Sequence, residues 1–173
     1  GPAGLMLSRI LASKGYKVLV IEKEAQLAKK VCGEGISSHV LQTALISEKD
    51  AERFVSRKIR KAYVYSPNGK CITLQGNGEV LGYIIDKRIF LRVMGEHAVD
   101  AGAHIMLLEP AIDFERIDGG FSIKTRNFKI RAKLLVGADG YSSLVARKLE
   151  LEKPKERKVI PSVQYVLANT DLE

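Results

Sequence analysis

This sequence of 173 residues has few of the features that mark a specialised class of protein. It has two cysteines, Cys32 and Cys71, in unrelated contexts, so it shows no disulfide framework, which favours a reducing cytoplasm. No apolar run approaches the roughly 20 residues needed to cross a bilayer, so we predict no transmembrane span. The three histidines, His39, His97 and His104, share no ligand spacing with either cysteine, so we predict no metal site.

Aromatic side chains are also scarce, at 6% of residues, whereas the formal net charge is +8. The cations are scattered, and no aromatic residues are interleaved with them to stack on bases, so we expect no nucleic-acid partner. An anionic membrane surface or a phosphorylated lipid suits the charge better, so we expect a cytoplasmic location with peripheral membrane contact as an option. No nucleophile elbow or Ser/His/Asp order supports a hydrolase.

The chain opens instead on a glycine-rich loop, residues 1–4, which leads into an apolar pattern of helical spacing and then a short apolar strand, residues 17–21. Glycines let backbone N–H groups approach a pyrophosphate, and the helix directs its positive end at it. Glu22 follows Gly4 by 18 residues, close to the spacing of about 20 at which an acid binds the ribose hydroxyls. This order is that of a dinucleotide-binding βαβ unit whose first strand is missing.

The rest of the chain alternates predicted helices and strands, as an α/β protein does. A hairpin is predicted around the Pro67-Asn68-Gly69 turn, and a strand that ends at Val136 leads through "GADG" into a helix capped by Ser142 or Ser143. The other predicted elements are the helices 39–57 and 88–101 and the strands "GYIIDK", "AHIMLL", "AIDFERI", "FSIKT" and "VIPSVQYVLANTDLE".

The chain resembles the FAD-dependent geranylgeranyl reductase family in the segments "GPAG", "VLVIEK", "CGEGIS", "YIIDKRIF", "AVDAGA" and "LLVGADGYSSLVARK". The best-known members are archaeal enzymes that saturate the isoprenoid chains of membrane lipids, and the family lies within the p-hydroxybenzoate-hydroxylase-like flavoproteins. "CGEGIS" is the most specific piece. The resemblance implies a Rossmann-like FAD-binding domain at residues 1–152 with its first strand missing and a β-hairpin inserted at about 60–76. The start of a substrate domain at 153–173 would follow, so we expect an N-terminal fragment of a longer protein.

The resemblance also implies a set of residues that bind the cofactor. They are Gly1, Ala3 and Gly4 at the pyrophosphate, Glu22 at the adenosine ribose, Cys32, Gly33 and Gly35 along the flavin, Lys87 or Arg88 as the basic contact, Ala111 near the adenine, and Asp139 close to the pyrophosphate and ribityl chain.

Two departures from the family's "D-R-x-x-F-D" motif bear on this set. The family usually has Arg where this chain has Lys87, and Asp where it has Leu91. Lysine supplies a positive charge but not the planar fork of donors of arginine, so the neighbouring Arg88 is an alternative cofactor contact.

The activity that the resemblance implies is the reduction of C=C bonds in a geranylgeranyl lipid by a FAD-dependent oxidoreductase. Its partners would be an isoprenoid lipid and an electron donor, either reduced nicotinamide, deazaflavin or ferredoxin. The flavin would supply the hydride. Cys32, the candidate catalytic residue, or an ordered water would supply the proton, unless Cys32 only packs beside the ring. The alternatives are an aromatic hydroxylase, a halogenase or a quinone-directed dehydrogenase of the same superfamily, and a non-catalytic nucleotide-binding fragment.

Overall fold

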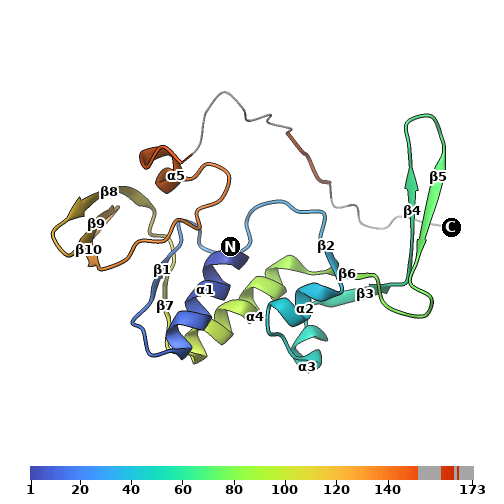
Figure 1. Ribbon diagram of the computed structural model, residues 1–173, viewed down its shortest axis with the longest axis horizontal. Coiled ribbons are helices and arrows are strands. Elements are labelled where there is room, and N and C mark those ends of the chain that lie inside the picture. The colour runs from blue at the N-terminus through green and yellow to red at the C-terminus, as the bar shows by residue number, and fades with distance from the viewer. Residues whose placement is uncertain (152–160, 166, 168–173) are drawn as a thin grey trace.

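Two long helices, α1 (Pro2–Ser13) and α4 (Lys87–Asp100), lie side by side at the centre of the computed structural model, which describes residues 1–151, 161–165 and 167 (Figure 1). Helix α1 has a proline in its first turn, where the fixed φ of proline is favourable. Helix α4 begins after Asp86, whose carboxylate accepts hydrogen bonds from two backbone N–H groups of the first turn. Both helices form where the sequence predicts them.

A parallel pair of strands lies beside these helices. Strand β1 (Leu19–Ile21) follows α1, and β7 (His104–Met106) follows α4 and pairs with β1. In the described part of the chain β7 is the one strand that pairs with β1. The backbone pairing continues beyond the strands, since the N–H of Glu22 donates to the carbonyl of Met106 (2.8 Å) and the N–H of Glu109 donates to the carbonyl of Glu22 (3.0 Å). The carboxyl ends of both strands therefore meet at one edge.

The segment predicted as one helix over 39–57 is not one helix, and this prediction is wrong. Two short helices, α2 (His39–Thr43) and α3 (Glu48–Ala51), precede strand β3 (Val55–Ile59). Leu45, between the helices, has a positive φ of 53°, which a continuous helix does not allow. Ser47 then starts α3 by accepting a hydrogen bond from the N–H of Asp50 (3.1 Å). Strand β3 pairs with β6 (Gly82–Ile85), which pairs on its other side with β2 (Gly35–Ser37).

A three-stranded antiparallel sheet, β8 (Ala111–Ile117), β9 (Gly120–Thr125) and β10 (Lys129–Ala132), lies at one end of the molecule (Figure 1). Strand β10 ends at Ala132 and not at Val136 as predicted, because residues 133–136 have no ladder partner among the described residues. Helix α5 (Leu144–Lys148) follows "GADG", and Ser143, not Ser142, is its N-cap. The predicted domain boundary at 152/153 and most of the strand predicted from Val159 lie outside the described residues, and 161–165 form no strand.

The predicted hairpin, β4 (Lys61–Tyr65) and β5 (Cys71–Gln75), projects from the end of the molecule opposite to β8–β10 (Figure 1). Directly opposite residues of an antiparallel pair lie on the same face, so the register divides the side chains into two sets. One face carries only apolar side chains, those of Ala62, Val64, Ile72 and Leu74. The last three of these are each at least half exposed.

The main core lies between α1, α4 and the β2–β6–β3 sheet. The rings of Phe54 and Phe90 meet edge to face with their centroids 5.1 Å apart. Leu91, where the family has Asp, is fully buried in this core, so its position here suits an apolar side chain. This packing sets the first turns of both helices in fixed positions. In the described part of the chain, no helix has the length and apolar character to cross a membrane.

Candidate cofactor-binding site

The opening loop and the predicted ribose residue lie together at the amino end of α1. The nitrogen of Gly1 is 3.9 Å from Oε2 of Glu22, whose other carboxylate oxygen accepts a hydrogen bond from the N–H of Glu24 (3.1 Å). The side chain of Lys87 lies close enough for its positive charge to act on the nitrogen of Gly1 as well. Gly1, Glu22 and Lys87 therefore share one region, although they come from three separate elements.

The amino end of α1 is open to an anion. No side chain caps this 12-residue helix, and its first turn contains no acid. The first N–H groups of a helix have no partners within the helix, and they carry its positive partial charge. A Cβ built on Gly1 would meet no atom of the described residues within 4 Å. This end of the helix can bind a phosphate through its backbone.

Gly4 brings the opening loop against the second glycine motif. A Cβ built on Gly4 would lie 3.3 Å from Cβ of Ala138, which is tighter than an ordinary contact. The absence of a side chain at Gly4 therefore allows "GADG" to pack on the first turn of α1. Two motifs that are far apart in the sequence meet at this one point.

Asp139, within that second motif, uses both carboxylate oxygens to hold α5. One oxygen accepts a hydrogen bond from the hydroxyl of Ser143 and the other from the N–H of Leu144, each at 2.6 Å. Burial raises the pKa of Asp139, but these hydrogen bonds outweigh the burial, and the net effect lowers the pKa. In this structure Asp139 acts on the turn and the helix, and its neighbour Ala138 is the residue of the motif that lies against Gly4.

Lys87 connects α4 to the loop that contains "CGEGIS". Its ammonium group donates a hydrogen bond to the carbonyl of Lys30, and its backbone N–H donates to the carboxylate of Glu34 (3.3 Å). The carbonyl of Glu34 accepts a further hydrogen bond from the N–H of Ile85 (2.9 Å). Glu34 was missed by the sequence analysis. Its place between two glycines is the one sequence signal that could have drawn attention to it, and its contact with Lys87 comes from the fold.

Arg88, the alternative basic contact, points elsewhere. Its side chain is 75% exposed and pairs with Asp86 at 3.7 Å. Lys87 is half-buried and lies against the loop. Of the two basic residues, Lys87 is the one that the structure brings to the opening loop.

The remaining predicted residues lie on exposed surfaces of the same region. Cys32 is a free, exposed thiol, and a Cβ built on Gly33 or Gly35 would meet no atom within 4 Å, so this face of the loop is open. Ala111 is the first residue of β8. It follows Glu109, whose N–H binds the carbonyl of Glu22, so the predicted adenine and ribose contacts lie at the same strand edge.

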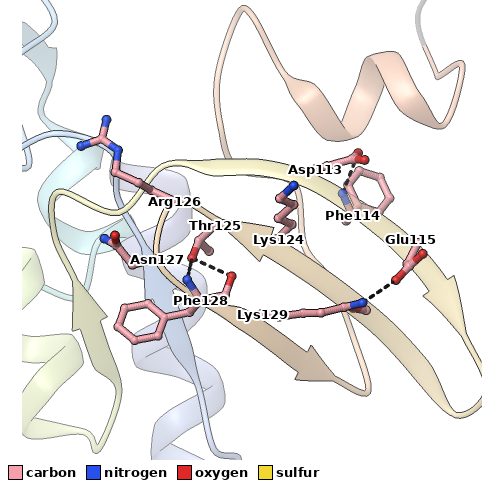
Figure 2. Close-up of a pocket in the computed structure, with 10 residues that line it drawn as sticks. Asp113, Phe114, Glu115, Lys124, Thr125, Arg126, Asn127, Phe128 and Lys129 are labelled. Atoms are coloured by element: carbon pink, nitrogen blue, oxygen red, sulfur yellow. Dashed lines mark hydrogen bonds and ion pairs between the residues drawn. The ribbon is translucent and has the colours of Figure 1, made fainter.

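A hollow of about 530 Å³ lies on the sheet formed by β8, β9 and β10, apart from the predicted cofactor residues (Figure 2). Three of its five charged side chains form ion pairs. Lys129 pairs with Glu115 at 3.2 Å, and Lys148 from α5 pairs with Asp113. The turn 125–128, which leads away from β9, forms one side of this hollow, and none of the predicted cofactor residues lines it. It is not where the predicted cofactor residues gather.

Comparison with known proteins agrees with this geometry. The family model of the FAD binding domain matches residues 1–173. Digeranylgeranylglycerophospholipid reductase 2 of Methanopyrus kandleri is 32% identical over the whole chain, which covers 44% of that relative. The crystal structure of a geranylgeranyl bacteriochlorophyll reductase-like protein from Thermoplasma acidophilum superposes with a TM-score of 0.73 and 32% identity over 81% of this chain and 37% of that one.

A more distant structure shares the fold alone. The flavin-dependent halogenase CmlS is 21% identical, with a TM-score of 0.66 over 87% of this chain and 30% of its own. The chain spans less than half the length of the relatives that it matches. The resemblance identified in the sequence and the α/β fold class are both confirmed.

Proposed function

This chain belongs to the family of FAD-binding domains, and we propose that it is the FAD-binding part of a reductase that saturates isoprenoid C=C bonds of geranylgeranyl lipids. The observation that carries this proposal is the similarity of the entire chain to a curated digeranylgeranylglycerophospholipid reductase. The sequence motif "CGEGIS" supports the same substrate class.

The residues present fit FAD. The amino end of α1, which no side chain caps, suits the pyrophosphate. The half-buried carboxylate of Glu22 suits the two ribose hydroxyls, and its negative charge would repel the 2′-phosphate of NADP. Lys87 adds a positive charge beside them. When bound, FAD supplies the hydride that reduces one carbon of the double bond.

The chain's own part in the chemistry is to place the reacting groups and to supply a proton. A saturated product requires a hydride at one carbon and a proton at the other. The Sγ atom of Cys32 lies on the exposed side of the loop and would donate that proton, with an ordered water as the other source. The hydrogen bonds of Lys87 to Lys30 and Glu34 would hold the loop, and therefore Cys32, in position. The two electrons come from an external donor: reduced nicotinamide, deazaflavin or ferredoxin.

A lipid substrate also requires contact with a membrane surface. Residues 53–78 contain six cations and no acid, which suits an anionic layer of headgroups. We therefore expect the protein to sediment with vesicles that contain anionic lipid and not with neutral vesicles at low salt.

The test of the proposed function uses the longer protein that contains this chain. We expect denaturation of the purified, yellow protein to release FAD. With a chemical reductant and a geranylgeranyl lipid, mass spectrometry should show the gain of two hydrogen atoms for each double bond. Release of nicotinamide nucleotide alone would contradict the cofactor assignment. Flavin that turns over while the lipid keeps all its double bonds would contradict the substrate class.

A further inference from the structure

Glu109 is a buried carboxylate that the proposed function does not use. It lies between β7 and β8 and is only 4% exposed. Its two oxygens accept hydrogen bonds from the backbone N–H and the side-chain amide of Asn127, each at 2.7 Å. In the described part of the chain it forms no ion pair with a lysine or arginine. A buried charge held by neutral donors is costly to leave unpaired, so these contacts fix the position of Asn127 strongly.

Thr125, at the start of the same turn, also acts on Glu109. Its hydroxyl is the largest contribution that lowers the pKa of Glu109, followed by the Asn127 hydrogen bonds and the charge of Arg126, while burial alone would raise the pKa. The same hydroxyl donates a hydrogen bond to the carbonyl of Phe128 (3.1 Å) and accepts one from the N–H of Phe128 (3.0 Å), so it also closes the turn. Glu109 is therefore the centre around which the turn 125–128 is built.

The backbone of Glu109 joins this turn to the ribose side of the site. Its N–H donates to the carbonyl of Glu22 (3.0 Å), and Ala111 pairs with Thr125 across β8 and β9. The turn is thus tied to Glu22 by the backbone of Glu109 and to Ala111 by the sheet. Figure 2 shows Arg126 and Asn127 extending from the turn on the side away from Glu115 and Lys129.

We propose that Glu109 is a positioning residue that holds the turn 125–128 as a wall of the adenosine pocket, with Arg126 as the side chain presented to the adenine. This inference rests on the proposed function, in which Glu22 and Ala111 bind the adenosine half of FAD. A guanidinium is suited to this place, because it stacks on flat aromatic rings as well as carrying charge. Glu109 itself touches no part of the cofactor and acts through the turn.

The consequence is a preference for FAD over FMN that depends on Glu109. FMN carries the flavin ring, the ribityl chain and one phosphate but lacks adenosine. Glu109→Gln replaces one carboxylate oxygen by an amide NH₂ group, which would face the donors of Asn127. We expect this variant to bind FAD about tenfold or more weakly and to bind FMN as the wild type does. Arg126→Ala, on an exposed side chain, should show the same selective loss without disturbing the buried carboxylate. Glu115→Gln, on the same sheet and paired with Lys129, is the matched control and should change neither affinity.

The experiment is calorimetric titration of FAD and FMN into the cofactor-free longer protein and the three variants. A loss for FAD alone in Glu109→Gln and Arg126→Ala supports the inference. Equal losses for FAD and FMN, or no loss in Arg126→Ala, overturn it, because a role confined to folding weakens both ligands alike. If Glu109→Gln does not fold, Arg126→Ala decides the question alone. Failure of the proposed cofactor can be told apart from failure of this inference, because the wild-type protein would then release no FAD on denaturation.

Discussion

The two adjacent basic residues of α4 offer a direct test of the predicted cofactor contact. In Lys87→Ala the charge beside Gly1 and Glu22 is removed, together with the hydrogen bond to Lys30. A hydrogen bond to a charged group contributes about 1.5–3 kcal/mol, which corresponds to roughly 10- to 150-fold in Kd. The lower half of this range applies, because Lys87 is only half-buried and water screens its charge.

Arg88→Ala is the matched control, since it removes an equal charge one residue away. The Arg88 side chain is 75% exposed and its one ion pair is with Asp86. The helix keeps its cap in this variant, because Asp86 still accepts hydrogen bonds from the backbone N–H groups of Arg88 (2.8 Å) and Ile89 (3.1 Å). We therefore expect unchanged FAD affinity in Arg88→Ala.

The assay is quenching of flavin fluorescence as FAD is titrated into the cofactor-free longer protein. Lys87→Gln separates the two effects of the substitution, because glutamine can still donate a hydrogen bond to the Lys30 carbonyl but carries no charge. Its affinity should fall between those of the wild type and Lys87→Ala. The reasoning is refuted if Arg88→Ala weakens FAD more than Lys87→Ala does, or if Lys87→Ala binds as tightly as the wild type.

Three further predictions concern the loop and the second glycine motif. Cys32→Ala should remain yellow and accept electrons but lose about 10²-fold or more in alkene reduction, as on loss of a general acid; a normal rate of lipid reduction would assign the thiol to packing. Gly137→Ala places a Cβ 2.7 Å from Cβ of Val145, so it should lower the free energy of unfolding by about 1–3 kcal/mol in denaturant titrations. Asp139→Ala removes the hydrogen bonds at the start of α5 and should cost about 1–2 kcal/mol at neutral pH. The folded-state pKa of Asp139 is lowered. The stabilisation by its carboxylate is therefore present above the unfolded pKa and is lost as the pH falls through the folded pKa. The difference in melting temperature between Asp139→Ala and the wild type should close in acid below about pH 4.

The parts of the fold that could be predicted are those whose signals are local. The opening loop and α1 follow from glycine, proline and helical spacing within one short segment. The hairpin follows from the Pro67-Asn68-Gly69 turn and the apolar residues on each side, and its strands form in that register. Strand β1 follows from the apolar run at residues 17–21, but its parallel pairing with β7 does not, because the predicted βαβ unit pairs β1 with the strand missing before α1.

The parts that could not be predicted depend on contacts between distant residues. The break at Leu45 comes from a backbone conformation that this residue type rarely adopts. Strand β3 is a strand because β6, more than 20 positions later, pairs with it. Glu109 and Glu34 are set by partners at Asn127 and Lys87, which no local pattern links to them. Of the predicted site residues, the structure brings Gly1, Gly4, Glu22 and Lys87 together, whereas the role of Cys32 stays a prediction.

The β4–β5 hairpin has two chemically different faces, and this gives it an orientation in any larger assembly. One face is aliphatic, and the other carries Tyr63 and Tyr65 with Lys61 over the ring of Tyr63 at 4.9 Å. A sheet or lipid layer that approaches the aliphatic face releases ordered water, whereas one that approaches the opposite face must strip a hydrated ammonium group and two phenolic hydroxyls. A neighbouring sheet or lipid layer therefore contacts the hairpin through its aliphatic face and not through the opposite face. The hairpin follows β3 and precedes β6 along the chain, so both of its ends connect to the sheet that packs on the core.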